Sequence, residues 1–145
     1  ADLPHLIFNM VTFWFFAFPL ERQIGPVRFA LLYFLALGVS DLGTYFKHRD
    51  NPQYASLGAS GAISAVLFAA IVYFPWMKLF IIPIPLPIPA PLFAVGYVAY
   101  SWYSARQARG RINHDAHLGG ALFGLLFVLL TDPAAFGQLL RWISS

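Results

Sequence analysis

The chain has 145 residues, of which 59 % are hydrophobic and 10 % are charged, and its formal net charge is +3. Soluble domains are roughly 45–50 % apolar and about 25 % charged, so this chain lacks the polar residues that would cover a water-soluble fold. Its few basic residues are scattered, which excludes a nucleic-acid-binding face. Cysteine is absent, which excludes a disulfide framework and a thiol nucleophile.

The apolar segments predict five membrane-spanning helices. A spanning helix needs roughly 20 mostly apolar residues, and polar or proline-containing stretches separate the candidates. In chain order they cover residues 5–20, 27–46, 57–76, 91–105 and 116–131. Pro19 and the charged Glu21 mark the expected end of the first helix. The fold class expected is therefore all-α, a polytopic membrane helix bundle that forms one domain over residues 1–145.

Residues 81–91, "IIPIPLPIPAP", carry a proline at every second position. Each proline lacks an N–H and disfavours helix in the residue before it, so extended or polyproline backbone is expected, and neither a helix nor a central strand. Extended backbone cannot face lipid with its polar groups unsatisfied. We therefore expect a loop at the membrane surface, with a plain rigid linker as the alternative.

The C-terminal residues 134–145, "AAFGQLLRWISS", follow "TDP" at 131–133. The tripeptide stops the fifth helix and is expected to cap a short amphipathic helix at the membrane interface. Lysines and arginines are spread over alternate loops, so the positive-inside rule gives no orientation.

Ser60 lies in "GASGA" at the start of the third apolar segment. Small residues at helical spacing, here Gly61 and Ala65, favour close packing of two helices, and Ser60 can belong to that packing face. The other interpretation is a nucleophile. Free N–H groups and the dipole at a helix N-terminus favour negative charge, which suits an oxyanion formed at Ser60.

His117 lies in "AHLGGALFG", where Gly120 and Gly124 give a GxxxG spacing that permits close helix contact. The histidine is either a structural hydrogen-bonding group or a general base, because imidazole titrates near neutral pH and is a natural partner for a serine hydroxyl. Asp115 is two positions away, roughly 200° around the helix, so a dyad is favoured over a triad. His114 is expected in the preceding loop.

His5 and Asn9 share one face of the first helix, because they are four residues apart. Both side chains can donate hydrogen bonds, so the pair indicates either an oxyanion hole or polar contacts between helices. No HExxH motif occurs, and the histidines lack a carboxylate at a recognisable ligand spacing. We therefore expect neither a metal site nor a cofactor.

The four stretches "HLIFN", "LERQIGPVRFALLY", "GASGA" and "AHLGGALFG" occur in this order on successive hydrophobic segments. This ordered set resembles the rhomboid family of intramembrane serine proteases, and the resemblance covers nearly the whole chain. It extends over helices two to six of the six-helix family core, so we expect a domain truncated at its N-terminus. Family members carry an aromatic residue four positions after the serine, stacked on the histidine, whereas Ser64 stands there in this chain.

The resemblance implies a role for each candidate residue. Ser60 is implied to be the nucleophile and His117 the general base and acid. His5, Asn9 and the backbone N–H of Ser60 are implied to form the oxyanion hole. The implied packing glycines are Gly61, Gly120 and Gly124. The site is expected near the outer face of the membrane, beneath a water-filled cavity.

The function implied is cleavage of peptide bonds in or next to transmembrane segments of membrane proteins. The expected partners are such substrates and the lipid bilayer, and the expected location is the bacterial plasma membrane. One alternative is an inactive relative that binds transmembrane helices, although such relatives usually lack the serine or the histidine. Another is a transporter fragment in which Ser60 and His117 line a substrate path.

Overall fold

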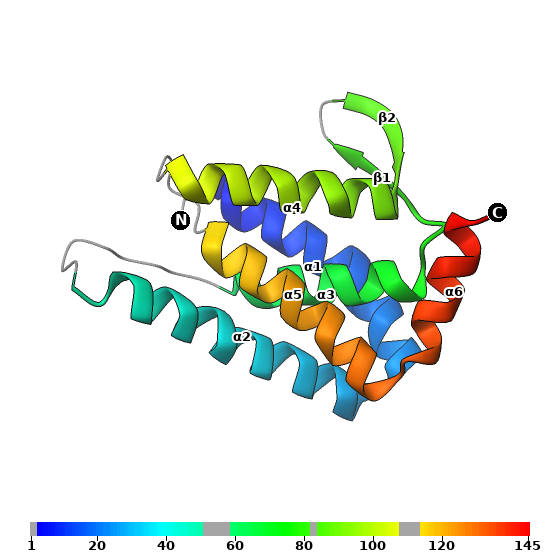
Figure 1. Cartoon of the computed structure of the whole chain (residues 1–145), viewed down its shortest axis with the longest axis horizontal. Helices are drawn as coiled ribbons and strands as arrows, with labels where there is room; N and C mark the ends of the chain where they lie inside the picture. Colours follow the sequence, from blue (N-terminus) through cyan, green and yellow to red (C-terminus); the bar gives the residue numbers. More distant parts are fainter. Residues whose placement is uncertain (1–2, 51–58, 82–83, 108–113) are drawn as a thin grey trace.

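The computed structural model describes residues 3–50, 59–81, 84–107 and 114–145, which form six α-helices and a two-stranded antiparallel hairpin (Figure 1). In chain order the elements are α1 (Leu3–Ile24), α2 (Pro26–His48), α3 (Ser60–Tyr73), β1 (Lys78–Ile81), β2 (Ile84–Pro89), α4 (Ala90–Gln107), α5 (His114–Thr131) and α6 (Ala134–Ile143). The expected helix bundle is confirmed, with the hairpin inserted between α3 and α4.

The centre of the bundle is α3. All of its residues are buried, and it contacts each of the other five helices that the structure describes. Its apolar side chains point in every direction, which is typical of a helix enclosed by protein. The helix ends at Tyr73, earlier than expected, because Pro75 cannot continue it. Residues 57–58 of the expected helix lie outside the described part of the chain.

Two glycines bring the backbone of α5 against the backbone of α3. A Cβ atom added at Gly120 would lie 2.7 Å from the carbonyl carbon of Gly61, and one added at Gly124 would lie 2.9 Å from that of Ala65. Both contacts advance by four residues in the same direction, so α3 and α5 run parallel and side by side (Figure 1). The glycines permit this close approach because they present no side chain at the contact.

The first helix continues through Pro19 to Ile24, beyond the expected end at Leu20. Leu20 is completely buried and Ile24 packs against the core, so tertiary contacts hold the last turn in spite of the missing proline donor. The chain then turns at Gly25, whose φ of 84° lies in the left-handed region that favours glycine. Pro26 begins α2, where its missing N–H costs no helical bond.

Within the proline-rich segment, residues 84–89 are extended, as predicted, but they form the strand β2, which pairs with β1, instead of a loop. The Ala90 N–H donates to the Met77 carbonyl oxygen at 2.9 Å. Because strand residues alternate, Ile88 also turns its N–H toward β1, while Pro87 and Pro89 turn their nitrogens away. Both strands are edges of a two-stranded sheet, which is where proline is tolerated.

Two expectations about the ends of helices are wrong. His114 lies inside α5 and is only 7 % exposed, because the helix begins two residues earlier than predicted. The "TDP" tripeptide gives α6 no side-chain cap, since the N-cap is Pro133 and it makes no such bond. The Asp132 carboxylate instead accepts a hydrogen bond from the Tyr73 hydroxyl at 3.1 Å, which joins the end of α3 to the start of α6.

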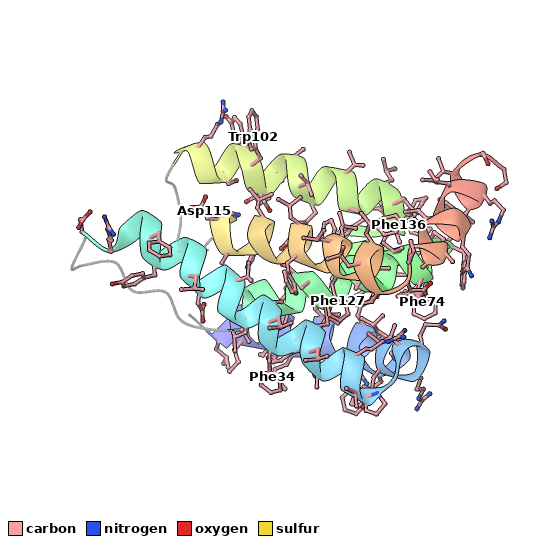
Figure 2. All side chains as sticks on the ribbon, turned by 60° about the horizontal axis from the view of Figure 1, so that its bottom comes forward. Phe34, Phe74, Trp102, Asp115, Phe127 and Phe136 are labelled. Atoms are coloured by element: carbon pink, nitrogen blue, oxygen red, sulfur yellow. The ribbon has the colours of Figure 1, made fainter. Side chains whose placement is uncertain are left out.

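The outside of the bundle is apolar. Phe34 on α2 and Trp102 on α4 project outward with exposed fractions of 67 % and 51 % (Figure 2). Soluble proteins rarely expose large contiguous apolar patches, so this surface suits a lipid environment. Among the described residues, Pro26–Phe46 and His114–Thr131 are long and apolar enough to cross a membrane, while Ser60–Tyr73 is a shorter apolar helix.

The contact between α3 and α5 generates a stability prediction. Gly120→Ala should lower the free energy of unfolding by about 1–3 kcal/mol, because the added methyl group meets the Gly61 backbone and overpacks the contact. Thermal unfolding in detergent measures the change. Gly119→Ala is the matched control, since a Cβ at Gly119 meets nothing within 4 Å; equal destabilisation by both variants would contradict the contact.

Candidate active site

Ser60 is the first residue of α3 and is 8 % exposed. The first helical bond described there runs from the Ile63 N–H to the Ala59 carbonyl oxygen at 2.9 Å. The N–H groups of the preceding turn therefore have no acceptor within the helix, and the N-cap residue, Ala59, gives them no side-chain cap. The hydroxyl of Ser60 thus lies at the positive end of a buried helix, a position that favours a developing negative charge.

His117 lies in the first turn of α5 and is half-buried. A Cβ atom added at Gly61 would lie 2.9 Å from the carbonyl oxygen of Ala116. The backbone immediately before His117 therefore touches the backbone immediately after Ser60. The structure brings the two chain segments together through this contact, and the hydrogen bond between the two side chains stays a prediction.

The imidazole of His117 is stacked on the ring of Tyr97 from α4, with ring centroids 6.1 Å apart and an interplanar angle of 18°. The Tyr97 hydroxyl is hydrogen-bonded to the hydroxyl of Ser64, with the two oxygens 2.8 Å apart. Ser64 lies one turn after Ser60 on the same face of α3. An aromatic ring therefore lies against the histidine although position 64 carries a serine.

Sequence reasoning missed Tyr97 as a neighbour of His117. It identified only that a serine stands at position 64, where family members carry the aromatic residue that stacks on the histidine. Tyr97 is one of several aromatic residues in α4, and spacing within one helix does not indicate which of them faces a histidine on another. The serine at position 64 was the one feature of the sequence that indicated an aromatic ring from elsewhere beside His117.

Asn9 lies on the inward stripe of α1, in register with Phe13, Phe16 and Leu20. This stripe packs into the bundle, where α1 contacts α3. His5 lies one turn earlier in α1, and its side chain is outside the described part of the structure. The structure therefore places Asn9 on the side of α1 that faces the core, and the joint role of the two residues stays a prediction.

Asp115 and His114 begin α5, one turn before the glycine contact (Figure 2 labels Asp115). An acidic residue in the first turn complements the helix dipole, which gives Asp115 a role that needs no catalytic triad. The ring of His114 makes an edge contact with that of Tyr100 at 5.5 Å. Within the described ranges there is no cluster of three or more histidine, cysteine, aspartate or glutamate residues that would hold a metal ion.

Comparison with known proteins gives one family. The rhomboid domain family model matches residues 1–133. The presenilin-associated rhomboid-like protein, mitochondrial, of Homo sapiens is 33 % identical over 148 aligned residues, which cover 97 % of this chain and 36 % of that protein. Rhomboid protein 1, mitochondrial, of Saccharomyces cerevisiae is 32 % identical, covering 85 % of this chain and 36 % of the relative.

A plant relative is similar to the same region. RHOMBOID-like protein 12, mitochondrial, of Arabidopsis thaliana is 29 % identical, covering 83 % of this chain and 40 % of the relative. This chain therefore spans well under half the length of each of these three relatives. No solved structure matches the chain significantly.

Proposed function

Because the chain belongs to the rhomboid family, we propose that it is an intramembrane serine protease that cleaves peptide bonds in or next to transmembrane segments of membrane proteins. The observation that supports this most is the backbone contact between Gly61 and Ala116, next to Ser60 and His117. It lies at the N-terminus of a buried helix inside a protein with an apolar outer surface.

In the proposed reaction His117 accepts the proton of the Ser60 hydroxyl while the serine oxygen attacks the scissile carbonyl carbon. A carbon–oxygen bond forms, and the carbonyl π electrons move onto the oxygen as an oxyanion. His117 then donates its proton to the leaving amine as the carbon–nitrogen bond breaks. Water attacks the acyl-enzyme with His117 again as base, which releases the acid and restores the serine.

The oxyanion needs hydrogen-bond donors that are already in place. The backbone N–H of Ser60 belongs to the first turn of α3, whose N–H groups have no acceptor within the helix. Asn9 approaches from the inward stripe of α1, and we assign His5 to the same hole as the second side-chain donor. Amide and imidazole groups both donate, so this set stabilises negative charge without a metal ion.

The proposed partners are membrane proteins whose transmembrane segment enters the bilayer region of the bundle. Such a helix must unwind locally before cleavage, since its carbonyl groups are occupied by helical hydrogen bonds. The chain is an integral membrane protein of its family. The bacterial plasma membrane expected from the sequence is the less supported location, because the three relatives are mitochondrial by name.

The nucleophile is tested with a serine-reactive fluorophosphonate on the intact protein in liposomes. We expect the protein to be labelled and Ser60→Ala to abolish the label, because no other hydroxyl is proposed to be activated. Ser101→Ala is the matched control, since Ser101 is buried in α4 and its hydroxyl has no hydrogen-bond partner among the described residues.

Two results of this labelling would contradict the proposal. Label that survives Ser60→Ala would place the reactive group elsewhere. Absence of label on the intact protein would favour a proteolytically inactive relative that binds transmembrane helices, which a pull-down of a transmembrane peptide then measures.

The oxyanion hole is tested with Asn9→Ala and His5→Ala. Each should lower kcat by about 10²–10³, because one donor to the oxyanion is lost, and cleavage of a transmembrane peptide measures the rates. Thr12→Ala is the matched control on α1, since the Thr12 hydroxyl already donates to the Phe8 carbonyl oxygen at 2.8 Å. A loss in the control as large as that in Asn9→Ala would mean that α1 is merely perturbed.

A further inference from the structure

A side chain from α4 lies against the ring of His117. Its imidazole lies nearly parallel to the Tyr97 ring, 6.1 Å away between centroids and tilted by 18°. Aromatic pairs in this distance range attract one another in offset stacked arrangements. The ring of His114, on the same helix as His117, makes an edge contact with the imidazole at 6.1 Å, and the Tyr97 ring restricts rotation of the imidazole from a second helix.

Tyr97 is itself held against α3 at two points. Its hydroxyl shares a hydrogen bond with Ser64 at 2.8 Å, and its ring lies 5.5 Å from that of Phe68 at an angle of 56°. Ser64 and Phe68 are one turn apart on the same face of α3. A third ring, that of Phe93 in α4, lies 5.9 Å away. These contacts fix both the position of the Tyr97 side chain and the orientation of its ring plane.

We propose that Tyr97 is a positioning residue for His117, locked in place by Ser64. The proposal rests on the proposed serine protease function, in which His117 must align with the Ser60 hydroxyl. A base and nucleophile transfer a proton efficiently only when their geometry is held within narrow limits. Tyr97 touches neither the substrate nor the reacting atoms in this assignment, and it acts through the plane of the imidazole.

Ser64 and Tyr97 form a matched pair. A large side chain at position 64 would occupy the face of α3 against which the Tyr97 ring lies, whereas serine leaves room for that ring and supplies a partner for its hydroxyl. In the family pattern, the aromatic ring beside the histidine comes from the helix of the serine, which is α3 here. In this chain, that ring comes from α4. Within the described residues, α4 has less contact with α3 than any other helix has, and this hydrogen bond joins the two helices.

The test uses Tyr97→Phe, Ser64→Ala and Tyr97→Leu in the intact protein. The readouts are the rate of fluorophosphonate labelling at Ser60, the kcat and KM for a transmembrane peptide, and the NMR shifts of the isotope-labelled His117 ring. Tyr97→Leu removes the ring, so labelling and kcat should fall about tenfold to a hundredfold with KM unchanged. The His117 resonances should move as the ring current is lost.

The two variants that remove only the hydrogen bond keep the aromatic ring. Tyr97→Phe and Ser64→Ala should each slow labelling about twofold to tenfold, and the double variant should be no slower than either one, because both remove the same bond. Tyr97→Phe therefore restores most of the rate lost in Tyr97→Leu. Tyr103→Leu is the matched control, an exposed tyrosine on the same helix, and should label at the wild-type rate.

Several outcomes would overturn the proposal. If Tyr97→Leu is labelled at the wild-type rate, Tyr97 does not position His117, although the serine protease function stands. Additive losses in the double variant would likewise overturn the role of Tyr97 and leave the protease function standing. If the wild-type protein is not labelled at Ser60, the proposed function itself fails. If the His117 resonances are unchanged in Tyr97→Leu, the stacking of the Tyr97 ring on the imidazole is refuted. If Tyr97→Leu does not fold, the test rests on the labelling rates of Tyr97→Phe, Ser64→Ala and the double variant, in which the two losses should not add.

Discussion

The arrangement of the bundle depends on the backbone contact between α3 and α5. Lipid tails are as apolar as leucine, so helices in a membrane gain little from hydrophobic burial and associate through close packing and polar contacts. Gly120 and Gly124 supply that closeness, and their partners on α3 are backbone atoms of Gly61 and Ala65. The same contact sets the start of α3 beside the first turn of α5, so the packing of these helices also brings together the chain segments that carry Ser60 and His117.

The enclosure of α3 gives its N-terminus an electrostatic role. A helix end on a protein surface satisfies its orphan N–H groups with water, whereas the end of α3 lies in a bundle where Ser60 is buried and the N-cap residue Ala59 offers no side-chain cap. Charge interactions are stronger where water is excluded. In the proposed reaction, an oxyanion that forms beside these donors offsets the cost of leaving them without a helical acceptor.

The sequence predicted the helices because they follow from periodicity within a single segment, and the spacing of Gly120 and Gly124 within one segment indicated a face suited to close helix contact. It failed where the answer lies between segments. The alternating prolines indicated extended backbone, but the pairing of Ile88 with Leu79 depends on β1, the short strand that directly precedes β2 in the chain. Pro19 indicated a helix end, yet burial of Leu20 outweighed the lost donor. Tyr97 is the same case at the site, since only tertiary structure brings α4 to His117.

The two helices that flank the candidate site, α5 and α4, are held against α3 by different interactions. On one side α5 carries His117 and is fixed to α3 by backbone contact, which leaves little room for displacement. On the other side α4 meets α3 through the hydrogen bond of Tyr97 to Ser64 and through contacts among aromatic rings. Because α4 also packs against α5, where the ring of Tyr100 contacts that of His114, α4 constrains both the helix that carries His117 and, through Tyr97, the plane of the imidazole.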